Sequence, residues 1–295
     1  MYNYISKILN ARWFPDICKT PTDYKVLVKR LHPDVNNNKT ATEAFIHLNR
    51  LKNEFENGYE FEDESGKYRS NYLVHRWGKS DLTELFKRNY DKLIQAATAT
   101  FDPDSFRHFM NYLPSHLNWE NDELVYRSSL KCIPLSRVIR LLPEDTKNKH
   151  VNRIYSRMIE FVTLLEALNI THAGLNPNSI FVIPETHGIK VTGFYHICTE
   201  KVKTINGKYK NYYPQQLFDT KKPGSYIDLS LIKKTALYAL GDPSGLGVKL
   251  RSDHRINQSV LEYLMKPESD ALRSMKTWRE ILNRYFIKEF IPFNI

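Results

Sequence analysis

The chain has 295 residues, of which 41% are hydrophobic, so it is long enough for one large or two to three smaller domains with real cores. Lysine and arginine outnumber aspartate and glutamate by 43 to 33, a net charge of +10 that permits an acidic partner, although a solvated basic surface explains it equally well. The cysteines Cys18, Cys132 and Cys198 lie far apart, which argues against a disulfide framework or a zinc site. With no leader pattern and no apolar run of roughly 18 residues, a soluble cytoplasmic protein without a membrane partner is expected.

The N-terminal part of the chain is predicted to be almost wholly helical. A short amphipathic helix is expected over residues 4–9. A second helix has Thr20 as its cap and Pro21 in its first turn, and it ends before Pro33, because proline disfavours the helical conformation of the preceding residue. A third helix from Thr40 carries apolar residues spaced to pack back on the second. The pattern predicts a helical hairpin closed by a polar loop.

The stretch DYKVLVKRLHPDV, residues 23–35, followed by ATEAFIHLNRLKNEFE, residues 41–56, resembles the J-domain of DnaJ-type co-chaperones. An H-P-D tripeptide alone also fits a proline-broken turn between helices. The resemblance rests on the residues around the tripeptide in the two flanking helices. Lys52 departs from the family, which usually has an aromatic residue there. The residues that match the family's pattern outside the tripeptide are Tyr24, Leu27, Arg30, Leu31, Phe45, Leu48 and Asn49.

The resemblance implies a partner and a binding surface. In this family the tripeptide and the basic helix before it engage a DnaK-type chaperone and stimulate its ATP hydrolysis. The implied trigger consists of His32, Pro33 and Asp34. The implied basic face, which would meet an acidic surface of the chaperone, consists of Lys25, Lys29 and Arg30. No Gly/Phe-rich linker or zinc-binding repeat follows, so a different module is expected to bind the client.

Short β-prone pieces punctuated by glycines begin near residue 59, which predicts a domain boundary there. Residues 72–77 are a second such piece. A hairpin is predicted with its turn at 120–122. A long helix is indicated by apolar residues at helical spacing from Ile154 to Leu168. The other predicted segments are helices at 80–99, 102–113, 227–240, 257–265 and 276–285, hairpin arms at 112–119 and 122–129, and strands at 179–183 and 188–192.

The segments HAGLNPNS, residues 172–179, and GFY, residues 193–195, resemble the catalytic loop and the D-F-G turn of protein kinases. The residues of the family's pattern that are kept are His172, Leu175, Pro177 and Phe194. Under this alignment Gly174 stands at the catalytic base, while Ser179 and Gly193 stand at the two metal ligands. All three roles therefore lack an anionic or amide group, and no active kinase is expected.

Further elements of the kinase pattern follow in order. Residues 122–139 resemble the last N-lobe strand, the hinge and the next helix, and residues 213–215 (YPQ) resemble the A-P-E element. The resemblance implies structural roles for Asp228, as the buried aspartate of the central C-lobe helix, and for Arg273, as the late arginine. Gln215 replaces the glutamate that normally pairs with that arginine.

The N-terminal lobe lacks the phosphate-binding pattern of this family. There is no G-x-G-x-x-G loop and no V-A-I-K strand, and Arg76 and Lys79 are the only guesses for the strand's lysine. The scattered histidines form no H-E-x-x-H motif, so no metal site is predicted. Binding of ATP or magnesium is not expected, and no cofactor is predicted.

The expected fold class is α+β, with an all-α J-domain at 1–58, a reduced β-rich kinase-like N-lobe at 59–130 and a mainly helical C-lobe at 131–295. The expected function is a J-domain co-chaperone whose inactive kinase-like domain binds an unknown protein client. Two alternatives remain open. One is an atypical ATP-dependent phosphotransferase or nucleotide-binding enzyme, and the other is a basic nucleic-acid-binding adaptor, for which the tyrosines and lysines of KYKNYY, residues 208–213, could stack bases beside phosphates.

Overall fold

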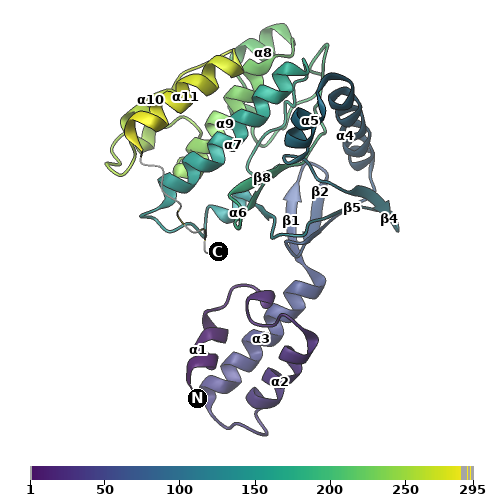
Figure 1. Cartoon of the computed structure of the whole chain (residues 1–295), viewed down its shortest axis with the longest axis vertical. Coiled ribbons are helices and arrows are strands. Elements are labelled where there is room, and N and C mark those ends of the chain that lie inside the picture. The colour runs from purple at the N-terminus through teal and green to yellow at the C-terminus, as the bar shows by residue number, and fades with distance from the viewer. Residues whose placement is uncertain (1, 287–290, 292, 294–295) are drawn as a thin grey trace. The chain divides into compact units, whose positions relative to one another are not determined.

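The computed structural model describes residues 2–286, 291 and 293 of the chain (Figure 1). The chain divides into two compact units. The first unit consists of Met1–Phe61 with Arg69–Asn71, and the second unit consists of Glu62–Tyr68 with Tyr72–Ile295. None of the helices described here is both long enough and apolar enough to cross a membrane.

The first unit is built on helices α1 (Tyr2–Asn10), α2 (Pro21–Leu31) and α3 (Lys39–Asn57), with the 3-10 turn η1 (Phe14–Asp16) between α1 and α2. The start of α2 is as predicted. The Oγ1 of Thr20 accepts the N–H of Asp23, and the Asp23 carboxylate accepts the N–H of Thr20 at 2.8 Å. This reciprocal pair satisfies two N–H groups that a helix start otherwise leaves without partners.

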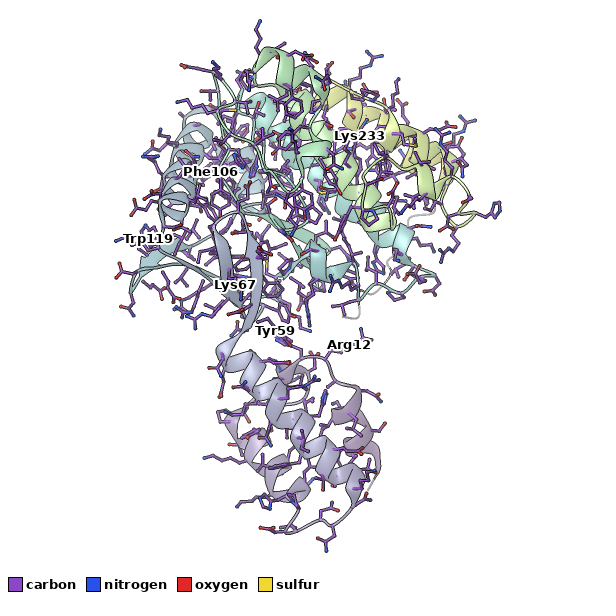
Figure 2. The ribbon with its side chains drawn as sticks, turned by 180° about the vertical axis from the view of Figure 1, so that it is seen from behind. Arg12, Tyr59, Lys67, Phe106, Trp119 and Lys233 are labelled. Atoms are coloured by element: carbon purple, nitrogen blue, oxygen red, sulfur yellow. The ribbon has the colours of Figure 1, made fainter. Side chains whose placement is uncertain are left out.

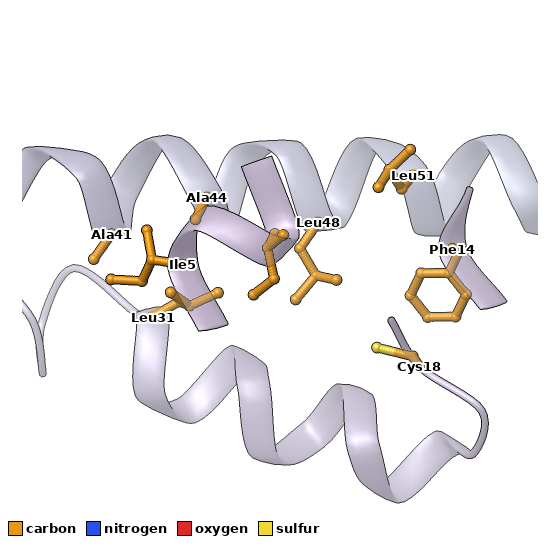
Figure 3. Close-up of a cluster of buried hydrophobic side chains, with 9 residues drawn as sticks. Ile5, Phe14, Cys18, Leu31, Ala41, Ala44, Leu48 and Leu51 are labelled. Carbon is orange, nitrogen blue, oxygen red and sulfur yellow. The ribbon is translucent and has the colours of Figure 1, made fainter. Parts of the chain in front are cut away.

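One apolar cluster holds the three helices of the first unit together (Figure 3). Small residues on α3 let the other helices approach its backbone, and the larger side chains fill the space between them. The buried members of the cluster are Ile5, Ile8, Phe14, Cys18, Leu31, Ala41, Ala44, Leu48 and Leu51. The predicted packing of the third helix on the second is present, with α1 as an additional layer.

A five-stranded sheet has the order β1-β2-β3-β5-β4. Its strands are β1 (Tyr59–Asp63), β2 (Gly66–Ser70), β3 (Val74–Gly78), β4 (Leu117–Glu120) and β5 (Glu123–Arg127). The pairs β3/β5 and β4/β5 are antiparallel. The sequence pattern did not separate β2 from its neighbours. Trp119, on the edge strand β4, lies at the border of the sheet (Figure 2).

The predicted hairpin turn forms at Asn121 and Asp122, whose φ angles are 48° and 60°. Asparagine and aspartate tolerate this left-handed conformation, which a two-residue hairpin turn requires. The prediction placed the start of the first arm at residue 112, and this was wrong. Strand β4 begins only at Leu117, and Pro114, which has no N–H to donate to a ladder, stands in the connection from the preceding helix.

Two helices, α4 (Asp81–Thr100) and α5 (Pro103–Met110), lie between β3 and β4 in the chain. Ser80 caps α4, and its Oγ accepts the N–H of Thr83 at 3.2 Å. The helix lies where it was predicted, and buried residues recur along it at helical spacing. These buried residues are Thr83, Phe86, Asn89, Tyr90, Leu93 and Ala97.

The rest of the second unit is mainly helical. The helices are α6 (Leu135–Val138), α7 (Lys147–Ala167), α8 (Gln215–Thr220), α9 (Ser225–Leu240), α10 (Gln258–Met265) and α11 (Ala271–Tyr285), with the 3-10 turns η2 (Lys210–Tyr212) and η3 (Val248–Leu250). The strands β6 (Ile133–Pro134), β7 (Ile180–Ile183) and β8 (Gly188–Val191) form a small antiparallel sheet. α7 and α9 pack against each other at the centre of the second unit (Figure 1). α7 contains the periodic apolar residues from which the long helix was predicted.

Candidate functional site

The H-P-D tripeptide forms a turn directly after α2. His32 ends the helix with φ −56° and ψ 134°, an extended conformation that proline requires of its predecessor. The N–H of Asp34 donates to Nδ1 of His32 at 3.3 Å, and the Asp34 carboxylate lies 3.4 Å from the same nitrogen. The His32 ring also packs edge-on against Phe45 of α3, with centroids 5.4 Å apart. The side chains of His32 and Asp34 are 43% and 85% exposed, so both can contact a partner.

The predicted basic face is present on α2, because Lys25, Lys29 and Arg30 are all exposed. Tyr24, on the opposite side of the helix, donates to Oδ1 of Asn49 at 2.6 Å and so ties α2 to α3. The departure at Lys52 has a physical reason. Its Nζ lies 5.2 Å from the centre of the Tyr24 ring and forms an ion pair with Glu56, so the lysine covers the ring as an aromatic side chain would.

The loop that resembles a catalytic loop is buried and held by α9. The N–H groups of His172 and Ala173 each donate to one oxygen of Asp228 at 2.8 Å. Burial raises the pKa of Asp228 to about 7, although these two hydrogen bonds favour its ionised form. Because both oxygens of Asp228 hold the backbone, the residue has the structural position that the kinase resemblance implied, and neither oxygen is directed to a ligand.

The residues that replace the catalytic base and the two metal ligands make close contacts with their neighbours. The Oγ of Ser179 donates to the carbonyl of Gly174 at 2.9 Å and so closes the loop on itself. A Cβ atom added at Gly174 would lie 3.2 Å from Cδ2 of His196, and one added at Gly193 would lie 3.1 Å from Cβ of Ser179. Gly193 also has φ +71°, where side chains are strained. A side chain at either glycine would therefore press its Cβ against a neighbouring side chain, and at Gly193 it would also strain the backbone.

Phe194 packs in the interior of the second unit and is fully buried. Its ring contacts Phe86 and Tyr90 of α4 and His172 of the loop, with centroid distances of 5.4, 5.6 and 5.1 Å. Its carbonyl accepts the side-chain N–H of Asn89 at 2.7 Å. The residue therefore links α4 to the loop through packing and one hydrogen bond, without any charged group.

The inward-facing residues of β3 are His75 and Trp77, and both are fully buried. An active kinase carries a lysine on this strand, paired with a glutamate of the following helix. Here Trp77 packs edge-on against Phe86 of α4, with centroids 5.5 Å apart. The two sequence-based guesses for the lysine were wrong. Arg76 faces away and pairs with Glu123 at 3.1 Å, and Lys79 is exposed beside Asp122.

Aromatic rings fill the space between the large sheet and β7. Tyr68 stacks on Trp77 at 5.0 Å, His75 stacks on Tyr126 at 5.3 Å, and Phe181 of β7 meets the edge of His75 at 4.9 Å. All five side chains are at most 2% exposed. Burial lowers the pKa of His75 to about 3, so the ring is neutral. Side chains of the protein itself thus occupy the region between the β3 strand and the helical lobe.

The second unit has a cavity of about 300 Å³ beside the two glycines of the kinase-like segments. Its wall includes Gly174, Ser179 and Gly193 of the kinase-like segments. The end of β1 and the turn after it contribute three acidic residues, which we call the acidic turn. The full lining is Glu62, Asp63, Glu64, Gly174, Asn176, Asn178, Ser179, Gly193, Tyr195, Asn206, Gly207 and Lys208. A kinase covers the phosphates with a glycine-rich loop here. Carboxylates at that position would repel phosphate groups.

The acidic turn is fixed to the segment after Gly193. Asp63 accepts hydrogen bonds from the Tyr195 hydroxyl at 2.8 Å and from Nε1 of Trp77 at 2.9 Å. Burial raises the pKa of Asp63, while these donors and Ser65 oppose the shift. Glu64 pairs with Nε2 of His196 at 2.7 Å. The sequence alone could not show these pairs, because 132 residues separate the partners in each of the Asp63–Tyr195 and Glu64–His196 contacts.

The expected place of Arg273 is not supported by its contacts. Arg273 is exposed in the first turn of α11, where its N–H donates to Asp270. Gln215 is likewise exposed and donates to Asp219 at 3.2 Å. The N–H groups of Ala271 and Leu272 donate to Glu166 of α7, which anchors the start of α11. Glu166 thus fixes the start of α11 without an arginine side chain.

Two other predictions concern ligands. Within residues 2–286, 291 and 293, no group of three or more His, Cys, Asp or Glu side chains is placed to hold a metal ion. In the KYKNYY segment Tyr209, Tyr212 and Tyr213 are at most 7% exposed. Their rings are therefore not available to stack nucleic-acid bases, contrary to what that alternative required.

No family model matches the chain, and no curated protein matches it. Among solved structures, the chain is similar to vaccinia related kinase 3, with 13% sequence identity and a TM-score of 0.50 over 81% of this chain and 94% of that chain. It is also similar to ROP2 from Toxoplasma gondii, a virulence factor with a protein-kinase fold and no enzymatic activity, with 12% identity and a TM-score of 0.50 over 72% of this chain and 74% of that chain. The chain thus has an α+β protein-kinase-like fold, with a sheet-containing N-lobe and a helical C-lobe. The J-domain resemblance stays a prediction.

Proposed function

We propose that this chain is a co-chaperone adaptor whose kinase-like unit is a non-catalytic scaffold. In this proposal the first unit recruits a DnaK-type chaperone and stimulates its ATPase, while the second unit binds a protein client. The recruiting and binding surfaces in one chain raise the effective concentration of chaperone at the client.

One observation carries the non-catalytic role. The three positions that would supply the base and the metal ligands are Gly174, Ser179 and Gly193, and the β3 lysine position is taken by His75 or Trp77. A positioned base contributes typically about 10²- to 10⁴-fold to rate, and metal ions neutralise the charge on the transferred phosphoryl group. Without either, and with carboxylates beside the cavity, phosphoryl transfer has no support in this unit. Asp228 offers no ligand to the alternative of an atypical phosphotransferase, since both of its oxygens hold backbone N–H groups.

The recruiting role is supported by the H-P-D turn and the helix before it. His32 and Asp34 present polar atoms to solvent from a turn fixed by Pro33, and three exposed cations precede them on α2. Cations on one helical face accelerate encounter with an acidic partner, and a rigid polar turn adds a contact that depends on orientation.

The test is the steady-state ATPase rate of a purified DnaK-type chaperone with and without the full-length chain. The wild-type chain is expected to stimulate the rate, and His32→Gln is expected to abolish the stimulation. His47→Gln, a change of the same type on α3, is the matched control and should retain it. Equal stimulation by wild type and His32→Gln would show that the turn is not a chaperone trigger.

A further inference from the structure

We infer that the segment between Glu200 and Lys222 docks an acidic protein segment that also carries apolar side chains. This inference rests on the proposed adaptor function, because it names the chemistry of the client. The segment holds six exposed lysines and two acidic residues, Glu200 and Asp219. We call the six lysines the lysine face. They are Lys201, Lys203, Lys208, Lys210, Lys221 and Lys222.

The fold brings the lysine face together from both ends of the segment. The N–H of Val202 donates to the carbonyl of Lys221 at 3.0 Å, which places the lysines on either side of Val202 beside Lys221 and Lys222. Lys210 lies over the ring of Phe218 in α8, with its Nζ 5.8 Å from the ring centre, and α8 leads directly into Lys221. The backbone therefore brings five of the lysines close together, namely Lys201, Lys203, Lys210, Lys221 and Lys222, while Lys208 lies in the wall of the cavity.

The lysine face differs from other lysines of the chain in its lack of ion pairs among the described residues. Elsewhere in the chain, lysines such as Lys52, Lys87 and Lys147 pair with carboxylates. Among the residues that the structure describes, no member of the lysine face makes an ion pair. Asp219 is engaged by Gln215 of its own helix. Such a concentration of positive charge favours an acidic partner.

An exposed apolar loop lies next to the lysine face. The loop of residues 243–248 is joined to the segment by two hydrogen bonds of 3.0 Å, from Asn211 to the carbonyl of Ser244 and from the Tyr212 hydroxyl to the carbonyl of Pro243. At its tip Leu246 and Val248 are 56% and 60% exposed. Apolar side chains bordered by charged ones are the usual composition of a protein-binding surface.

These features distinguish a protein partner from a nucleic acid. The tyrosines of the segment are buried and cannot stack on bases, and Leu246 and Val248 offer nothing to a phosphate backbone. Lys208 also lines the acidic cavity together with Glu62 and Glu64. A continuous phosphate backbone would be repelled by those carboxylates, whereas a polypeptide can present acidic and neutral side chains in turn.

The first experiment measures binding of a fluorescein-labelled Glu-rich peptide to the full-length chain by anisotropy. The variant Lys201→Glu/Lys203→Glu/Lys221→Glu/Lys222→Glu is expected to weaken binding roughly tenfold or more, because four attractive charges become repulsive. The matched control reverses four exposed cations of α11 in Arg273→Glu/Lys276→Glu/Arg279→Glu/Arg284→Glu and should weaken binding less than about threefold. Equal weakening in both variants, or no binding by the wild type, would overturn the inference. Circular dichroism melts check that both variants fold.

The second experiment compares two peptides of equal charge, one with leucines among the glutamates and one with serines in their place. The leucine peptide is expected to bind more tightly, and Leu246→Ser/Val248→Ser should remove the difference. A single-stranded oligonucleotide of the same charge that binds as tightly as the leucine peptide would instead assign a nucleic-acid site. No chaperone is present in these assays, so peptide binding can fail while ATPase stimulation by the chain persists, and the reverse result is equally distinguishable.

Discussion

Two histidines in this chain make the same local hydrogen bond in different surroundings. Nδ1 of His32 accepts the N–H of Asp34 at 3.3 Å, and Nδ1 of His172 accepts the N–H of Gly174 at 3.2 Å. The side chain of His32 is 43% exposed, whereas His172 is fully buried between Phe161 and Phe194. Both turns resemble a family motif, but only the first presents its polar side chains to solvent.

The contrast between the two turns shows that a motif histidine can be retained in a packing role. Burial lowers the pKa of His172 to about 3, so this ring is neutral and serves packing and backbone geometry. The polar turn at His32 and Asp34 keeps 43% and 85% of those side chains exposed, so its polar atoms stay available for contact with a partner.

Phe194→Ala is expected to destabilise the second unit by about 3–5 kcal/mol, because it empties a fully buried site bounded by α4 and His172. Urea unfolding followed by tryptophan fluorescence measures the loss. Phe106→Ala, at a half-buried position on α5, is the control and should cost about 1 kcal/mol (Figure 2). Equal losses in the two variants would show that Phe194 is not part of a packed core.

His75→Phe is expected to stabilise the protein most at acidic pH. Neither ring nitrogen of His75 has a hydrogen-bond partner among the described residues, and burial lowers its pKa to about 3. An unfolded histidine titrates near pH 6.5, so the unfolded state binds the extra proton between these values, and stability is lost as pH falls through that window by about 1.4 kcal/mol per pH unit.

Phenylalanine keeps the ring contacts with Tyr126 and Phe181 and cannot titrate, so the variant should lose less stability on acidification. The difference is measured by urea midpoints of wild type and His75→Phe at pH 7.5 and at pH 5. The first pH lies above the titration range of about 3 to 6.5 and the second lies within it. An unchanged pH dependence would mean that His75 is not buried in its neutral form.

Gly193→Asp restores the carboxylate of the kinase pattern and is expected to cost about 1–3 kcal/mol without giving kinase activity. The cost follows from φ +71° and from the 3.1 Å approach to Cβ of Ser179. Gly207→Asp, in the wall of the same cavity but with no atom within 4 Å of its added Cβ, should change stability by less than about 0.5 kcal/mol. Autophosphorylation by Gly193→Asp would contradict the interpretation of a filled site.

His32→Gln should leave the free energy of unfolding within about 0.5 kcal/mol of the wild-type value, since 43% of the side chain is exposed and its surroundings are partly solvent. His172→Gln should cost about 1–3 kcal/mol, because glutamine cannot reproduce the buried ring contacts. Urea unfolding of the two variants under identical conditions compares them directly. A larger loss at His32 would reverse the contrast between the two turns.

Local sequence features predicted much of this structure. Thr20 and Pro21 marked a helix start, and Asn121 with Asp122 marked a hairpin turn, because in each case the signal and its effect lie within a few residues. The order of motifs around His172 predicted the protein-kinase-like fold for a similar reason, since each motif is a short segment at a characteristic spacing.

The content of the site could not be predicted in the same way. His75 contacts Phe181 and Asp63 contacts Tyr195, and more than one hundred residues separate the partners in each pair. Such contacts produce no periodic pattern in the sequence from which they could be predicted. The guesses at Arg76 and Lys79 failed because they assumed that a lysine position must still be occupied by a cation. On a strand, alternation decides which side chains face inward, and here those are His75 and Trp77.

Titration of the full-length chain with ATP in the presence of magnesium, followed by thermal unfolding, tests most directly whether the protein's own side chains fill the nucleotide site. The filled space between β3 and β7 and the acidic turn at Asp63 predict no change in Tm up to millimolar nucleotide. A ligand at one hundred times its Kd stabilises a protein by about 2.7 kcal/mol. A saturable, magnesium-dependent rise in Tm would therefore contradict the account.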